Sequence, residues 1–116
     1  MLQNAYIALG TDFPVEEVSP LATFHAAVAR KNNQNEPRNG FQMENSLDRI
    51  SALRGMTMWA AKAQFEEKEK GSIEVGKRAD FIILNTDLLQ TDEKLLRLSQ
   101  VISTYVLGEK VYEKER

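Results

Sequence analysis

The first apolar run of the chain, residues 5–9, reads Ala-Tyr-Ile-Ala-Leu and has no alternating polar positions. Such a run is typical of a strand that is buried on both faces, as in a parallel sheet. Gly10 and Pro14 follow it and favour a loop. We therefore expect a short buried strand, Ala5 to Leu9, that runs into a loop.

A helix is predicted directly after this loop. Ser19 can cap it and Pro20 suits its first turn. The spacing i, i+3, i+4, i+7 of its non-polar face predicts a helix that reaches about Arg30, and that face comprises Leu21, Phe24, His25 and Val28. Strand, loop and helix in this order form half of a β/α unit.

The next segment, residues 31–40, is the most polar of the chain and predicts an exposed loop. A second helix is expected to begin at Asn45 or Ser46 and to be ended by Gly55. Thr57 then predicts the cap of a third, alanine-rich helix that reaches about Phe65.

Beyond Gly71 the pattern changes from helical to extended. Residues 80–84 are a β-branched apolar strand, and residues 93–99 predict a short helix or turn. Residues 101–107 form a further strand, which we expect to be a free sheet edge. A turn at Gly108-Glu109 would return the chain into residues 110–112 as a hairpin. We divide the chain into modules 1–70 and 71–116.

Neither module satisfies its own pairing requirements. A single parallel strand leaves backbone hydrogen-bonding groups on both edges without partners, and a thin sheet leaves an apolar face open. One interpretation is that the chain is a fragment or needs another chain. The alternative is a small α+β domain in which residues 5–9 join the C-terminal hairpin.

Composition narrows the classes of function. The 116 residues are 42% hydrophobic and 28% charged, with a net charge of −2, so bulk electrostatic binding of nucleic acid is not expected. The absence of cysteine excludes disulfides and thiolate metal sites, and a single histidine leaves too few nitrogen ligands for a transition-metal site. No targeting or membrane segment is visible, so a cytoplasmic location is expected.

Asp12 is the most informative polar residue, because it follows the apolar run directly. A carboxylate at the end of a parallel strand can bind a metal and accept a proton from water. The alternative is a turn aspartate that accepts backbone N–H bonds. We interpret His25 as a packed or hydrogen-bonded helix residue. Trp59 is expected to pack in the core or between the two modules, and Asp80 to accept N–H bonds from the preceding turn in a structural role.

Three motifs of the chain resemble the amidohydrolase superfamily, in its branch of D-aminoacylase-like and N-substituted formamide deformylase-like enzymes. The first is Gly-Thr-Asp-Phe-Pro at residues 10–14 with Ser-Pro-Leu at 19–21 and Ala-Ala-Val-Ala-Arg at 26–30. The second is Gly-Ser-Ile-Glu-Val-Gly-Lys-Arg-Ala-Asp-Phe-Ile-Ile-Leu at 71–84, and the third is Val-Leu-Gly-Glu-Lys-Val-Tyr at 106–112. They occur in the family's order and together cover nearly the whole chain.

The resemblance implies an α/β fold. Residues 1–70 would be the last β/α unit of a metal-dependent hydrolase TIM barrel, and residues 71–116 part of the composite β-sandwich. It also implies hydrolysis of amide-type C–N bonds with a divalent metal, frequently zinc. Asp12 would be the catalytic aspartate that binds or faces the metal, and Thr11 and Phe13 would line the substrate pocket. The loop of residues 31–40 would either overhang that pocket or serve as an exposed connector, and we favour the connector.

The family's histidine metal ligands are absent from this sequence. We therefore expect that the chain alone is inactive and binds no metal tightly. Its expected partners are the missing N-terminal part of the same enzyme and a small amide-type substrate, with self-association through exposed strand edges. The competing hypothesis is a small non-catalytic α+β interaction or oligomerisation module.

Overall fold

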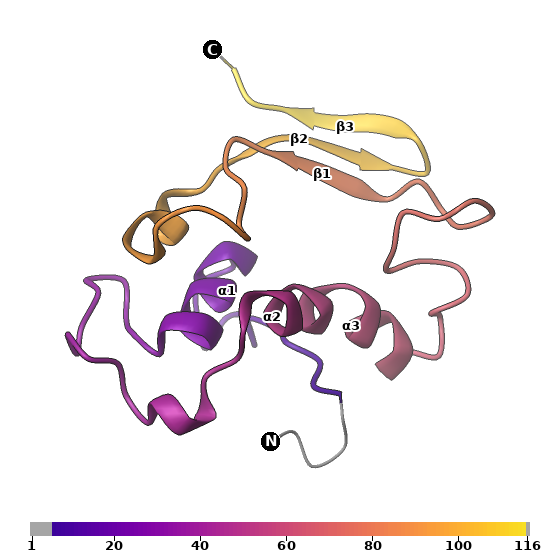
Figure 1. The fold of residues 1–116 in the computed structure, drawn as a ribbon. Coiled ribbons are helices and arrows are strands. Elements are labelled where there is room, and N and C mark those ends of the chain that lie inside the picture. The colour runs from indigo at the N-terminus through magenta and orange to yellow at the C-terminus, as the bar shows by residue number, and fades with distance from the viewer. Residues whose placement is uncertain (1–5, 116) are drawn as a thin grey trace.

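Helices occupy the first part of the chain and strands the last part. The computed structural model describes residues 6–115, and Figure 1 shows the sheet on one side of the molecule and the helices on the other. The elements in chain order are α1 (Pro20–Ala29), the 3-10 helix η1 (Met43–Asn45), α2 (Arg49–Met56), α3 (Met58–Ala63), β1 (Phe81–Leu84), the 3-10 helix η2 (Glu93–Leu98), β2 (Val101–Val106) and β3 (Glu109–Glu113). Within the described residues, none of these helices has the length and apolar composition that crossing a membrane requires.

The sheet is antiparallel and has the order β1-β2-β3. The prediction that residues 101–107 form a free edge is wrong, because β2 pairs with a strand on each side. Phe81 lies opposite Tyr105 and the two rings stack with centroids 4.5 Å apart. Among the described residues, the edges of the sheet are therefore β1 and β3, and β3 is exposed along its whole length.

The hairpin between β2 and β3 turns one residue earlier than predicted. Leu107 and Gly108 occupy its two central positions and both have positive φ, 53° and 82°. This conformation matches the twist of antiparallel strands, and glycine adopts it without a steric penalty. The Asp80 carboxylate accepts a hydrogen bond from the Leu107 N–H at 2.8 Å, so its structural role is confirmed but the predicted partner, the preceding turn, is wrong.

One hydrophobic cluster joins the helices to the sheet. Its buried members come from α1, α2, η2 and the loop after β1, and they are Leu21, Phe24, Ala52, Leu88 and Leu96. Leu84 of β1 and Val101 of β2 pack against the same cluster. Because the cluster draws on both halves of the sequence, the sheet is held against α1 and α2 by shared hydrophobic burial.

Three α-helices were predicted and residues 6–115 contain three, but α2 begins later than expected. Asp48, and neither Asn45 nor Ser46, is its N-cap, and its carboxylate accepts the Ser51 N–H at 2.9 Å. Gly55 lies inside α2 and does not end it. The predicted short helix over residues 93–99 is present as η2.

The segment before α1 is not a strand over its described residues, Tyr6 to Leu9, which contradicts that part of the prediction; Ala5 lies outside the described residues. The Leu9 N–H donates to the Gly55 carbonyl of α2 at 3.0 Å. A strand needs a neighbouring strand to pair its backbone groups, and the described chain places a helix there instead. This segment carries the chain to Asp12.

Candidate functional site

Asp12 lies in a tight turn between the N-terminal segment and α1. Its φ is 52°, in the left-handed region that aspartate tolerates better than most residues. The turn is closed by the Asp12 backbone carbonyl, which accepts the Val15 N–H at 2.9 Å, so the carboxylate is not needed to close it. The Asp12 side chain is exposed to solvent.

The residues on either side of Asp12 have different environments. The Thr11 hydroxyl accepts the Phe13 N–H at 3.3 Å and is partly buried. The Phe13 ring is 65% exposed. A ring this exposed leaves its apolar face free for a ligand or for another part of a protein.

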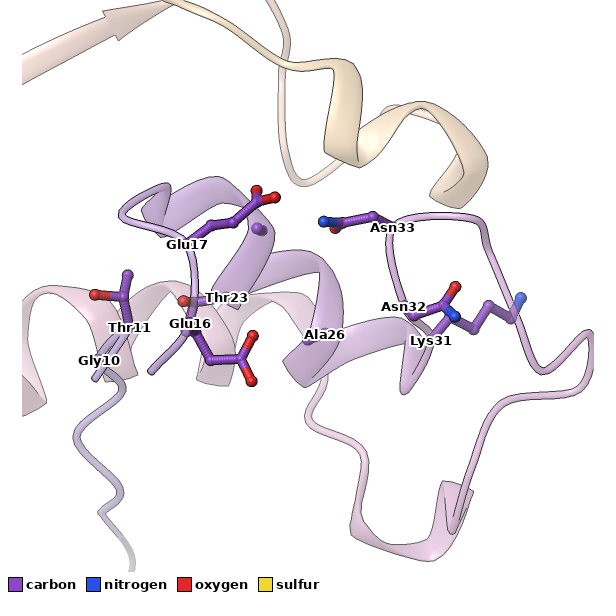
Figure 2. A pocket seen from close by; sticks show the side chains of 10 residues that line it. Gly10, Thr11, Glu16, Glu17, Thr23, Ala26, Lys31, Asn32 and Asn33 are labelled. Atoms are coloured by element: carbon purple, nitrogen blue, oxygen red, sulfur yellow. The ribbon is translucent and has the colours of Figure 1, made fainter. Parts of the chain in front are cut away.

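A pocket of about 450 Å³ lies beside this turn. Figure 2 shows side chains that line it, which are Gly10, Thr11, Glu16, Glu17, Ala22, Thr23, Ala26, Lys31, Asn32 and Asn33. Of the three predicted site residues, Thr11 lines the pocket, whereas Asp12 and Phe13 are next to it in sequence and are not among its lining residues. The structure thus brings the predicted segment to a pocket, and of its three predicted site residues only Thr11 lines that pocket.

The two walls of the pocket come from separate segments. The turn after the N-terminal segment supplies one wall, and the start of the loop after α1 supplies the other. Figure 2 shows Glu17 and Asn33 pointing toward one another from these two walls. Sequence reasoning identified the turn, but for the loop it favoured an exposed connector over a segment that overhangs the pocket, because no motif marks Asn32 and Asn33 beyond the high polarity of their segment.

His25 is not a ligand of this pocket. It is 1% exposed on α1, and its Nε2–H donates to the Asn35 side-chain oxygen at 3.1 Å. Burial lowers the pKa of His25 below its ordinary value, since the charged imidazolium loses its hydration. Its prediction as a packed, hydrogen-bonded residue is confirmed.

The Trp59 indole also packs against another side chain. Its ring meets that of Tyr6 edge to face, with centroids 5.9 Å apart, and the Lys62 ammonium lies 3.8 Å from the centre of the Tyr6 ring. Trp59 thus packs, but its contact with Tyr6 lies within residues 1–70 and Trp59 is only partly buried, so this contact is neither the core packing nor the packing between modules that was predicted.

The described residues do not by themselves provide a metal site. Over residues 6–115 no group of three or more histidine, cysteine, aspartate or glutamate side chains is placed to hold a metal ion. Asp12 offers a single carboxylate, whereas divalent metals in proteins are held by several ligands. The donor set described here therefore does not fit a metal.

Comparisons with known proteins agree on one family. Residues 2–112 match the family model described as the amidohydrolase family. The chain is 32% identical over 105 residues to the amidohydrolase YtcJ of Bacillus subtilis, covering 90% of this chain and 20% of that protein. It is 34% identical over 108 residues to the N-substituted formamide deformylase of Arthrobacter pascens, covering 93% and 19%.

Similarity extends to a plant protein and to a solved structure. The protein LONG AFTER FAR-RED 3 of Arabidopsis thaliana is 38% identical over 112 residues, which cover 94% of this chain and 18% of that protein. The crystal structure of an amidohydrolase from Thermotoga maritima superposes with a TM-score of 0.58 at 23% identity, covering 89% of this chain and 22% of that one. The chain thus spans about a fifth of the length of these relatives.

Proposed function

The chain belongs to the amidohydrolase family, and on this premise we propose that it is the C-terminal part of a larger hydrolase that cleaves amide-type C–N bonds. The observation that carries the proposal is the match of residues 2–112 to the family model. The similarity to an enzyme named N-substituted formamide deformylase supports an amide-type bond as the one cleaved.

Within that enzyme we propose that Asp12 is the carboxylate that accepts a proton from the attacking water. An exposed carboxylate beside a pocket can act as a general base when a water lies within hydrogen-bond distance of it. The turn geometry supports this role, because the Asp12 backbone carbonyl closes the turn and leaves both carboxylate oxygens available. We propose that Thr11 and Phe13 contact the substrate.

We further propose that neighbouring elements complete this chain. The segment Tyr6 to Leu9 would pair as the last strand of a (β/α)8 barrel once strands lie beside it, since an extended apolar segment needs partners on both edges. The sheet β1-β2-β3 would belong to a β-sandwich. The exposed side chains of Ile82 and Tyr112, which share the sheet face opposite to that of the buried Ser103, support a second layer over it.

The cofactor proposed for the whole enzyme is a divalent metal, most simply zinc. Asp12 would bind or face this metal, and its other ligands would come from the rest of the enzyme, because residues 6–115 contain no group of three or more candidate ligands. The proposal therefore assigns to this chain a proton acceptor and part of the substrate pocket, and it implies that the isolated chain neither holds the metal tightly nor turns over substrate.

The proposal is tested by a segment exchange. In the Arthrobacter pascens deformylase, the 108 matched residues are replaced by this chain, and hydrolysis of an N-substituted formamide is measured. We expect the chimera to hydrolyse the formamide while the isolated 116-residue chain does not. A folded chimera that shows no hydrolysis above background would count against the proposed function.

A further inference from the structure

The loop of residues 31–40, which carries the second wall of the pocket, is tied to the helical core. The buried His25 of α1 donates its Nε2–H to the Asn35 side-chain oxygen at 3.1 Å. Asn35 has a φ of 60°, so the backbone bends sharply where it meets His25. The loop is therefore fixed near its middle by a hydrogen bond from inside the protein.

Hydrogen bonds to the Asn32 side chain fix the start of the loop. The Asn32 side-chain oxygen accepts the N–H groups of Gln34 at 2.9 Å and Glu36 at 3.0 Å. The backbone N–H of Asn32 donates in turn to the Glu36 carbonyl at 2.8 Å. Asn35 thus lies inside a closed hydrogen-bonded turn, so moving Asn35 would move Asn32 with it.

A salt bridge holds the base of the loop. The Lys31 ammonium lies 2.7 Å from a Glu93 carboxylate oxygen of η2, and most of the Lys31 side chain is buried. Since its charge is paired there, Lys31 contributes mainly its stem to the pocket. The polar groups that the loop presents to the pocket are then the carboxamides of Asn32 and Asn33.

We propose that His25 is a positioning residue for the pocket: through Asn35 it holds the 31–40 loop so that Asn32 and Asn33 form the wall opposite Thr11 and Glu17. This inference rests on the proposed function, in which the pocket receives the polar part of an amide substrate. Carboxamide groups on one wall and a carboxylate on the other offer both donors and acceptors to an amide group. The loop wall would then determine which polar substituents fit beside the scissile bond.

Two substitutions of His25 separate positioning from packing. His25→Gln retains an N–H donor near the Nε2 position, whereas His25→Leu fills a similar volume and has no donor. Hydrogen exchange of the loop amides, read by NMR in the 116-residue chain, reports the local opening of the loop. The amide of Ala52, which donates to Asp48 in α2, serves as the internal reference for global stability.

In His25→Leu we expect the amides of Asn32, Gln34 and Asn35 to exchange faster by about tenfold relative to Ala52, because one net hydrogen bond is lost. In His25→Gln we expect rates near those of the unchanged protein. Equal loop protection in all three proteins would overturn the proposal, and so would equal loss in both variants.

A substitution of Asn35, the hydrogen-bond partner of His25, tests the proposal even if His25→Leu fails to fold. His25 is the only histidine, so its ring signal can be followed without assignment of others. Asn35→Asp keeps an acceptor and adds a negative charge, which we expect to raise the pKa of His25. A His25 titration that is unaffected by Asn35→Asp would show that the two side chains do not meet and would refute the proposal.

These measurements need no turnover, so they are independent of the proposed hydrolysis. In the deformylase chimera, His25→Leu should raise KM while changing kcat little, since the loop wall contacts the substrate rather than the reacting atoms. If every chimera is inactive, the proposed function fails while the NMR results still decide whether His25 positions the loop.

Discussion

A missing side chain at Gly55 allows the N-terminal segment to reach its position. A Cβ atom built on Gly55 would lie 2.9 Å from the Ile7 carbonyl oxygen and 2.9 Å from Cγ of Leu9. Real Cβ atoms do not approach other atoms so closely, and one of these contacts is with rigid backbone. The close packing of residues 7–9 on α2, and with it the path to Asp12, therefore depends on glycine.

We predict that Gly55→Ala lowers the free energy of unfolding. Alanine favours a helix over glycine by about 1 kcal/mol, but overpacking costs about 1–3 kcal/mol. Gly10→Ala is the matched control, because no atom lies within 4 Å of a Cβ built there. Urea denaturation compares the two, and equal stability of both variants would show that the segment does not pack on Gly55.

His25 predicts a dependence of stability on pH. Burial lowers the pKa of His25 below the ordinary 6.5, and the positive charges of Arg97 and Lys31 lower it further. The hydrogen bond to Asn35 and the negative charge of Glu93 raise the pKa, but they do not outweigh burial. The unfolded chain therefore takes up the proton first as the pH falls. The stabilisation is complete above the unfolded pKa of 6.5 and decreases below it until the folded pKa is reached.

The expected result is a fall in the free energy of unfolding below pH 6.5 that is absent in His25→Gln. Its slope cannot exceed about 1.4 kcal/mol per pH unit for one proton. Urea titrations at a series of pH values measure it. Hydrogen bonds to Ser51 lower the pKa of the Asp48 carboxyl, so Asp48 changes the free energy of unfolding only near and below pH 3.8. The pH ranges in which His25 and Asp48 act are therefore separate.

At the scale of elements, local sequence signals predicted where the helices lie more accurately than where each helix begins and ends. Ser19 and Pro20 predicted the start of α1 correctly, although the Ser19 side chain makes no capping hydrogen bond. For α2 the prediction placed the cap at Asn45 or Ser46, whereas Asp48, two residues beyond Ser46, is the residue whose side chain caps the helix. The run of apolar residues predicted β1 well. Residues 6–9 have the same kind of run but do not form a strand, because no strand lies beside them in the described chain.

η2 is the element that fixes the second half of the chain to α1, and its packing can be tested. Leu96 is fully buried in the shared cluster, while its neighbour Leu95 is 51% exposed. We predict that Leu96→Ala lowers the free energy of unfolding by about 2–5 kcal/mol and that Leu95→Ala changes it by less than about 0.5 kcal/mol. Denaturant unfolding of both variants provides the comparison, and similar effects would contradict the observed packing.

At the scale of the whole molecule, the candidate site is assembled from segments that no single motif connects. The turn at residues 10–17 could be singled out from sequence, because an acidic residue follows an apolar run. The contribution of Asn32 and Asn33 could not, since it depends on the fold of the loop around Asn35 and on its bond to His25. Long-range hydrogen bonds of this kind leave no periodic signal in sequence.

The exposed apolar sheet predicts that the isolated chain associates with itself. Within residues 6–115, β1 is an edge strand of apolar residues, including Ile82 at 48% exposure, whereas β3 carries charged residues that discourage edge pairing. We expect size-exclusion chromatography to show species larger than 13.2 kDa and Ile82→Lys to shift them toward monomer. A monodisperse monomer of the unchanged chain would rule this out.

The most direct test of the proposed role of Asp12 is the rate of formamide hydrolysis by the deformylase chimera with Asp12→Asn. Loss of a general base reduces kcat by about 10²–10⁴-fold. Glu109→Gln, which removes a negative charge from the exposed strand β3, is the control and should leave kcat unchanged. A chimera that hydrolyses the formamide equally well with asparagine at position 12 would contradict the account.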